Sequence, residues 1–131
     1  MEADNRFNRT ERLKQKRLFD ALFSGAKRSF AHPLLAIWKP MPLPAKVPIQ
    51  IGFSVPKKAY KKASDRNTIK RKLREAYRLQ KSFLTDHLNE QGTQIALLIV
   101  VQKSDNTSYE VLQKKMMVLL QEVADKTKHA E

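Results

Sequence analysis

The chain has 131 residues, and 26 Lys and Arg against 13 Asp and Glu give it a formal net charge of +13. It contains no Cys, which excludes disulfides, thiolate metal sites and Cys nucleophiles. A hydrophobic fraction of 41% with only 3 Gly is typical of a folded domain rather than a disordered basic tail. We expect one domain over residues 10–126, with flexible segments at 1–9 and 127–131.

The N-terminal residues lack the apolar segment of a signal peptide. The longest apolar run, Ile95–Val101, is too short to span a bilayer. We therefore expect a soluble protein of the cytoplasm.

The first half of the sequence predicts one helix and two strands. The helix is expected over residues 10–23 and ends before Gly25, which suits a C-terminal cap. A short apolar run at 33–39 is typical of a strand, and four prolines in 40–48 indicate a loop. Alternating apolar residues from Ile49 to Val55 predict a second strand with one apolar face.

The second half predicts a helix, a buried strand and a last helix. After a basic loop at 57–64, Asp65 is the expected N-cap of a helix that ends near His87. Residues Ile95–Val101 are continuously apolar, as in a strand buried on both faces. Thr107 and Glu110 form a potential capping box for the last helix. This order predicts an α+β fold, a small sheet covered on one side by helices. The expected core stripes of the two helices are Ile69, Leu73, Ala76, Tyr77 and Leu84, then Leu112, Met116, Leu119, Leu120 and Val123.

The positive charge is concentrated in residues 57–81. Eleven Lys and Arg against Asp65 and Glu75 give this segment a net charge of +9. Arg66, Lys70 and Arg74 recur every four residues, as does Arg78, so the predicted helix carries them as one stripe. Such a stripe repels itself, and its natural partner is a phosphate backbone, although a solvated basic face is the simpler alternative.

Three further residues have two possible roles. Asn67 could cap the basic helix or hydrogen-bond a phosphate or a 2′-hydroxyl group. Phe19 and Phe23 share a helix face; they could belong to the core or stack on unpaired bases. For Trp38, we favour the core or its rim.

The segment RNTIKRKLRE (Arg66–Glu75), preceded by IGFSVPKK (Ile51–Lys58), resembles the signature of the bacterial ribonuclease P protein component family. The first predicted helix also fits the family, through Arg12–Leu13, Phe19, Phe23 and Gly25. The resemblance covers roughly residues 9–125, and several motifs in register are more specific than one short match. One departure is Thr68, where the family pattern has a second Arg; Thr68 keeps a hydrogen-bonding group without the charge.

The resemblance implies an αβββαβα fold with an extra strand near Phe30 and a left-handed βαβ crossover at the basic helix. It also implies a protein that binds a catalytic RNA, one copy per RNA, and the 5′ leader of precursor tRNA. The RNA with bound Mg²⁺ would then cleave the leader and leave a mature 5′-phosphate. The implied contacts to the RNA subunit are Lys62, Arg66, Asn67, Lys70, Arg71, Arg74 and Arg78. The implied leader-cleft residues are Arg12, Phe19, Phe23, Lys57 and Lys58.

The residue inventory agrees with a protein that binds rather than cleaves. His32, His87 and His129 are scattered without ligand spacing, and we assign no catalytic residue to the chain and no metal site. Three other functions stay open. They are a ribosomal protein or RNA chaperone, a DNA-binding domain that uses the basic helix, and, as the weakest, a stand-alone nuclease.

Overall fold

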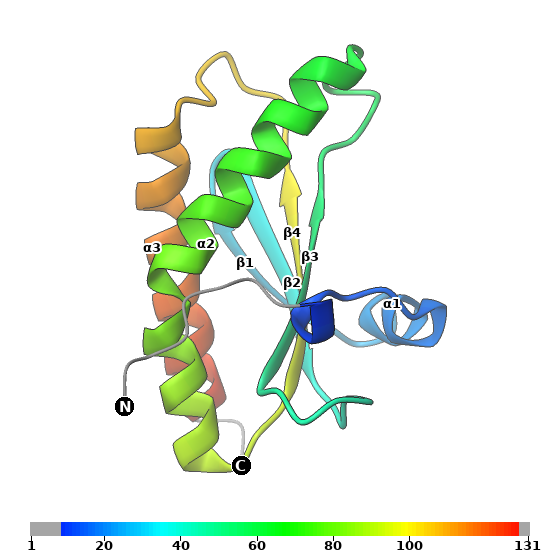
Figure 1. Ribbon diagram of the computed structural model, residues 1–131, viewed down its shortest axis with the longest axis vertical. Helices are drawn as coiled ribbons and strands as arrows, with labels where there is room; N and C mark the ends of the chain where they lie inside the picture. Colours follow the sequence, from blue (N-terminus) through cyan, green and yellow to red (C-terminus); the bar gives the residue numbers. More distant parts are fainter. Residues whose placement is uncertain (1–8, 129–131) are drawn as a thin grey trace.

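The computed structural model describes residues 9–128, which form an α+β domain around one sheet (Figure 1). The expectation that helices cover only one side of the sheet is wrong, because the first helix buries Leu18 and Leu22 on the opposite face. The predicted flexible ends fall largely outside these residues, but Arg9 already belongs to a 3₁₀ turn and α3 extends to Lys128. In chain order the elements are η1 (Arg9–Glu11), α1 (Lys16–Leu22), β1 (Lys27–Ala31), β2 (Leu34–Pro40), β3 (Ile49–Ser54), α2 (Ala63–Gln91), β4 (Ile95–Val101) and α3 (Tyr109–Lys128). This is the αβββαβα order that the resemblance implied, including the strand around Phe30.

The sheet has the order β1-β2-β4-β3 within the described residues. β1, β2 and β4 pair antiparallel, whereas β3 pairs with β4 in parallel, with Ile49 opposite Ile95 and Ser54 opposite Val100. The central strand β4 is buried on both faces, as its apolar sequence predicts. β3 is therefore an edge strand beside the long basic helix α2.

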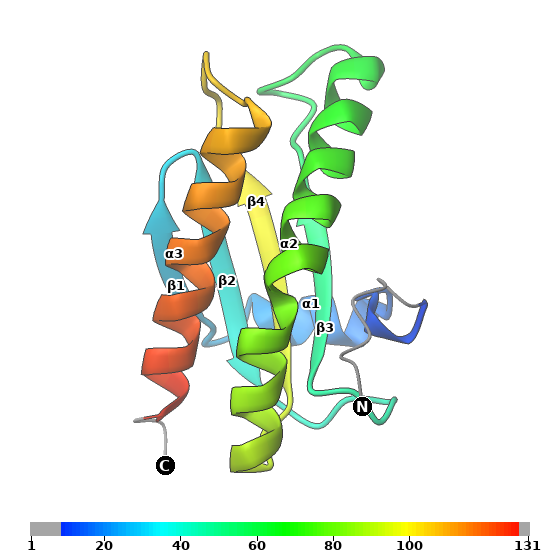
Figure 2. The same cartoon turned by 60° about the vertical axis from the view of Figure 1, so that its left-hand side comes forward.

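The β3–α2–β4 connection is left-handed. In Figure 2 both strands point upward, α2 lies in front of the sheet, and β4 stands to the left of β3. Connections of this type are right-handed in about 98% of proteins, so residue patterns alone would have predicted the opposite hand. The handedness agrees with what the resemblance implied.

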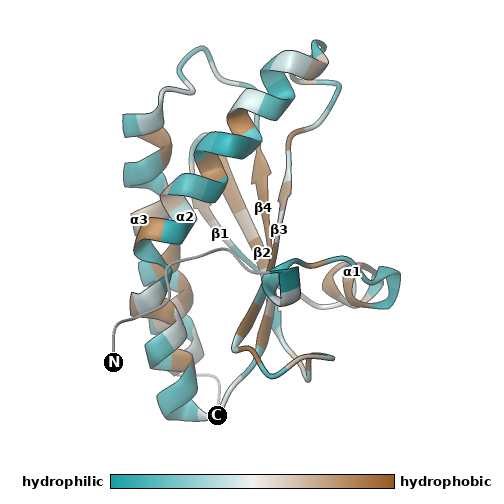
Figure 3. Ribbon diagram, viewed as in Figure 1, coloured by the Kyte–Doolittle hydropathy of each residue, from teal (hydrophilic) through white to brown (hydrophobic). Residues whose placement is uncertain are grey.

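Apolar side chains pack on both faces of the sheet. On one face, α2 and α3 bury their predicted stripes against the strands, and all ten of those residues are at most 3% exposed. On the other face, Leu13, Leu18 and Leu22 pack on Ile37 and Leu98. Figure 3 shows the brown strands enclosed between these layers, with hydrophilic residues turned outward on α2. Trp38 lies fully in the core.

The helix predicted over residues 10–23 is wrong in its first half. Arg12 and Leu13 are extended, because Arg12 forms a parallel bridge with Ile51 and the Leu13 amide donates to the Ile51 carbonyl at 3.0 Å. After the 3₁₀ turn at Arg9–Glu11, the α-helix begins only at Lys16. The exposed edge of β3 offers backbone partners that outweigh the weak helix preference of this segment. Gly25 lies past the helix end with φ of 83°, where it turns the chain into β1.

Both predicted N-caps are also wrong. α2 begins two residues before Asp65, with Lys62 at the cap position, and α3 begins at Tyr109. The Ser108 hydroxyl, rather than Thr107, accepts from the Val111 amide at 3.4 Å. At its C-terminus α2 extends to Gln91, four residues past the expected end at His87. It is capped there by Gly92, whose φ of 67° needs glycine-like freedom. Within residues 9–128, none of the helices has the length and apolar character needed to cross a membrane.

Candidate nucleic-acid interface

A groove runs between η1–α1 on one side and β3 with α2 on the other. It consists of two adjoining hollows of about 300 and 400 Å³. Leu13, Gly52, Phe53 and Lys70 line both hollows, so they join into one channel. The groove therefore lies where the N-terminal segment meets the edge strand and the basic helix.

One end of the groove is cationic. Arg12, Lys14, Lys70 and Arg74 line the smaller hollow. Lys70 and Arg74 stand one turn apart on α2, and Arg12 faces them because its backbone bridges to β3. The N-terminal segment thus brings positive charge from one part of the sequence to the basic helix from another.

The other end of the groove is aromatic. Phe19 is half-buried against the apolar cluster of its face, whereas Phe23 is 66% exposed. Both line the larger hollow. The sequence left two roles open for both residues. In the structure Phe19 contributes to packing, whereas the ring of Phe23 is exposed to solvent.

The floor of the groove is the polar side of β3. Ile49, Ile51 and Val55 pack in the main core, and Gly52 has the opposite orientation, toward Leu13 and Leu98. A Cβ atom at Gly52 would lie 3.4 Å from Leu98 Cδ1 and 3.6 Å from Leu13 Cβ. Because Gly52 has no side chain, the groove is deeper at this position.

Two residues of the predicted basic stripe are held by the protein itself. The Arg66 guanidinium donates to the carbonyls of Tyr60 and Lys61, at 2.8 and 2.9 Å, and so fixes the loop before α2. Arg78 donates two hydrogen bonds to the carboxylate of Glu75 on the preceding turn. The bond from Arg78 lowers the pKa of the exposed Glu75 carboxyl.

Lys62, Asn67, Arg71 and Arg74 are exposed on α2 or its cap, and Lys70 is half-buried at the groove. Lys72 points the other way, because its ammonium group donates to the Thr107 carbonyl at 3.0 Å. The Thr68 hydroxyl donates to the Ser64 carbonyl within the helix at 2.9 Å.

Lys57 and Lys58 are exposed in the turn after β3 and are not among the residues that line the groove. The Tyr60 hydroxyl anchors the following loop, since it donates to the Gln102 carbonyl at 2.8 Å and accepts from the Ser104 amide at 3.1 Å. The structure thus places this lysine pair just beyond the aromatic end of the groove, after Val55.

One important contact was missed by the sequence reasoning. Lys81, counted above as part of the basic run, is 4% exposed and donates to both carboxylate oxygens of Glu11 at 2.8 and 3.1 Å. Glu11 immediately precedes Arg12, so the pair fixes the groove wall to α2. Burial, and next the Glu11 charge, raise the pKa of the nearby Tyr77. The sequence held one signal for this contact. Lys81 lies four residues after Tyr77 and three before Leu84, so it falls on the side of α2 that was predicted to be buried.

Within residues 9–128, no three His, Cys, Asp or Glu side chains are grouped as a metal site would require. The residues that line the groove supply cations, aromatic rings and backbone groups. This combination suits the binding of an extended polyanion with exposed bases.

A protein-family model described as Ribonuclease P matches residues 7–124. The chain is 39% identical over 84 residues to a ribonuclease P protein component of Chlorobaculum tepidum, covering 62% of this chain and 54% of that relative. It is 26% identical over 117 residues to one of Porphyromonas gingivalis, covering 89% and 85%. The chain thus spans about half the length of the first of these relatives and most of the second.

Two solved structures share the fold. The ribonuclease P protein of Staphylococcus aureus matches with a TM-score of 0.69 at 18% identity, covering 86% of this chain and 94% of that one. The protein from Thermotoga maritima matches with a TM-score of 0.66 at 21% identity, covering 84% and 94%. The arrangement of three helices and four strands in residues 9–128 is that of these proteins.

Proposed function

This chain belongs to the ribonuclease P protein family, and on that premise we propose that it is the protein subunit of a ribonuclease P ribonucleoprotein. In this function it binds the catalytic RNA, one copy per RNA, and the 5′ leader of precursor tRNA in the cytoplasm. The complex removes the leader as an endonuclease and leaves a mature 5′-phosphate.

The observation that carries the proposal is one groove that joins the cations of its smaller hollow to the half-buried ring of Phe19 and the exposed ring of Phe23. A single strand lying along it would place phosphates near Arg12, Lys70 and Arg74 and bases near Phe19 and Phe23. Stacking on an aromatic ring tolerates any base, which suits leaders of different sequence. A duplex offers no unpaired base to these rings, so the groove favours a single-stranded segment.

The outward side of α2 suits the RNA subunit. Lys62, Asn67, Arg71 and Arg78 lie outside the groove lining, while Lys70 and Arg74 lie at its rim. Arg66 contributes by fixing the loop before the helix rather than by a free guanidinium. Cations placed along a phosphate backbone release counterions, so the RNA would need less Mg²⁺ to fold and to hold its substrate.

We assign the hydrolytic step to the RNA subunit and its bound Mg²⁺. Within the described residues, carboxylates are not grouped as protein ligands of Mg²⁺ would be. The protein contributes neutralisation of charge and a grip on the leader, which raises the affinity for precursor over product.

The deciding experiment is cleavage of a precursor tRNA by a bacterial ribonuclease P RNA at low Mg²⁺, with and without this chain. We expect strong stimulation with a correct mature 5′ end. RNA binding without stimulation, repeated with several bacterial RNAs, would instead favour a general RNA-binding protein.

A further inference from the structure

The sheet face that carries the groove continues beyond Phe23. The backbone of α1 lies against β2 and β4 and, within the described residues, not against β1. The helix crosses the sheet below the ends of β1, β3 and β4 (Figure 1, Figure 2). A strip of the sheet next to these ends is therefore left without a helix over it.

Four side chains form a row across this strip, one from each strand. Ser54 of β3 lies opposite Val100 of β4. Leu35 of β2 lies opposite Val100 on one side and opposite Phe30 of β1 on the other. Directly opposite residues project from the same face of a sheet, and Leu35 and Val100 pack in the apolar cluster under α1. The row therefore spans this face from edge to edge, about 15 Å at the usual spacing of strands.

The row begins in the groove and ends at an exposed aromatic ring. Ser54 lines the larger hollow together with Phe23. Leu35 is 9% exposed, Val100 is half-buried and Phe30 is 56% exposed. An apolar surface thus continues from the groove to the far edge of the sheet, where the ring of Phe30 is open to solvent.

Positive charge lies at the same edge. Arg28 is exposed and projects from the same face as Phe30, because side chains two residues apart on a strand share a face. Within the described residues its guanidinium makes no hydrogen bond and no ion pair. Arg28 also borders a hollow of about 560 Å³ in which three cations stand against one carboxylate, and the residues that line it are Lys27, Arg28, Asp125 and Lys126.

We propose that the 5′ part of the precursor leader continues from the groove along this row, stacks a base on Phe30 and places a phosphate at Arg28. The inference rests on the proposed function and extends the leader-binding surface to β1. In that function the RNA subunit contacts α2, so the leader enters at the cationic end of the groove. The nucleotides farthest from the cleavage site are then the ones that reach Phe30.

Continuity and charge favour this occupant over an apolar partner. One exposed Phe is common on a protein surface and needs no ligand. Phe30, however, ends a row that starts in a groove suited to single-stranded RNA, and a guanidinium lies beside it. A ring that stacks any base, next to a donor that suits phosphate, matches a polyanion with unpaired bases.

Precursor tRNAs with leaders of different length test the proposal in the complex of this chain with a bacterial ribonuclease P RNA. Phe30→Ala should weaken binding of a precursor with a leader of about ten nucleotides at least about fivefold. It should leave unchanged the binding of a precursor with a leader of about two nucleotides, which is too short to cross the sheet. Phe30→Trp should retain tight binding because it keeps an aromatic face, whereas Phe30→Leu should not. Circular dichroism checks the fold of each variant.

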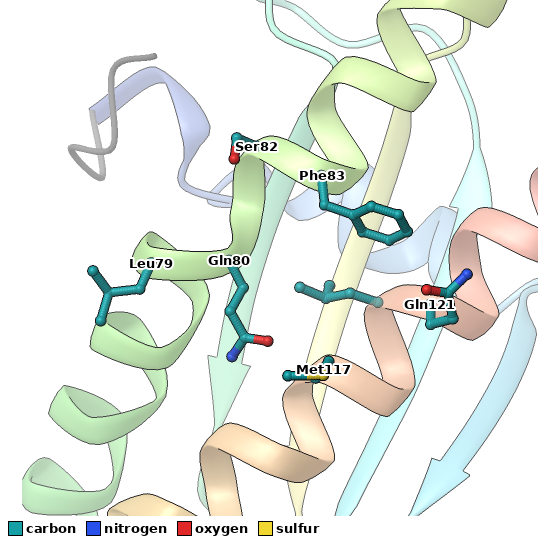
Figure 4. A pocket seen from close by; sticks show the side chains of 7 residues that line it. Leu79, Gln80, Ser82, Phe83, Met117 and Gln121 are labelled. Carbon is teal, nitrogen blue, oxygen red and sulfur yellow. The ribbon is translucent and has the colours of Figure 1, made fainter. Parts of the chain in front are cut away.

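Two further variants test the phosphate contact and the specificity of the effect. Arg28→Gln should reduce the slope of log K against log salt by about 0.7, for the long leader only. Phe83→Ala is the matched control, since Phe83 is 49% exposed and lies on α2, over the other face of the sheet. Figure 4 shows its ring reaching from α2 toward α3. This variant should leave the ratio of the affinities for long and short leaders unchanged.

Phe23→Ala separates this inference from the proposed function. If Phe23→Ala weakens binding of the long leader and Phe30→Ala does not, the leader ends at the groove and only the inference is overturned. Equal losses for long and short leaders in Phe30→Ala would also overturn it, because the ring would then not contact the 5′ part of the leader. If neither variant weakens binding, the groove does not hold the leader and the inference falls with it. Stimulation of cleavage by the parent chain then shows separately whether the proposed function holds.

Discussion

Lys81 and Glu11 form a buried ion pair, in which the ammonium nitrogen lies 2.8 Å from one carboxylate oxygen, across 70 positions of sequence. Lys81 belongs to α2 and Glu11 to the 3₁₀ turn before the extended segment, so the pair joins the two walls of the groove. The groove geometry therefore depends on a contact that binds no ligand itself.

Removing one partner of this pair should destabilise the fold strongly. Lys81→Met leaves the Glu11 carboxylate buried without its partner, and we expect a loss of about 3 kcal/mol in the free energy of unfolding. The double variant Glu11→Leu with Lys81→Met should recover part of that loss, because no charge is then left buried. Urea unfolding measures both; a single variant as stable as the parent chain would contradict this view of the pair.

Phe23 should matter for binding and hardly for stability. Its ring is 66% exposed, so Phe23→Ala should change the free energy of unfolding by less than about 0.5 kcal/mol. Loss of one stacked base should lower the affinity for precursor tRNA by about 1–3 kcal/mol and leave mature tRNA unaffected. Filter binding with both RNAs measures this difference.

Phe19→Ala provides the comparison, since Phe19 is half-buried and its removal should cost stability as well as leader affinity. If Phe23→Ala lowered the affinity for precursor tRNA and for mature tRNA equally, the Phe23 ring would not contact the leader.

Gly52 should tolerate a methyl group and reject a large side chain. Its backbone is not in the left-handed region, and an added Cβ would meet neighbours at ordinary distances of 3.4 to 3.7 Å. Gly52→Ala should therefore bind precursor tRNA normally. Gly52→Leu should fill the groove floor and weaken binding of leader-bearing RNA by about tenfold. Normal leader binding by the Leu variant, once its fold is verified, would place the leader elsewhere.

Reversing the charges of Lys70 and Arg74 together should weaken RNA binding and flatten its salt dependence. Each lost phosphate contact reduces the slope of log K against log salt by about 0.7 to 0.9. Lys46→Glu is a control of the same chemistry, because Lys46 is exposed in the proline-rich loop outside the groove lining. A slope that stays unchanged in the double variant would mean that the stripe is only a solvated face.

Reliable prediction from sequence was confined to features that repeat locally. The apolar run of β4 and the stripes of α2 and α3 follow from side-chain periodicity, and the structure confirms each of them. The N-terminal segment could not be predicted in the same way. Its helical spacing is real, but Leu13 pairs with the edge of β3, which is remote in sequence.

The sequence by itself determined the α+β class, the helix and strand cores, the family resemblance and the concentration of positive charge, because each resides in a contiguous pattern of residues. Only the tertiary structure decided which charges are available: Lys81 is neutralised by Glu11, Arg66 and Lys72 are bound to backbone carbonyls, and Lys70 and Arg74 meet Arg12. It also decided which face of β3 forms the groove floor and which Phe is exposed. Burial and pairing depend on partners brought together from distant parts of the chain, and no local pattern encodes them.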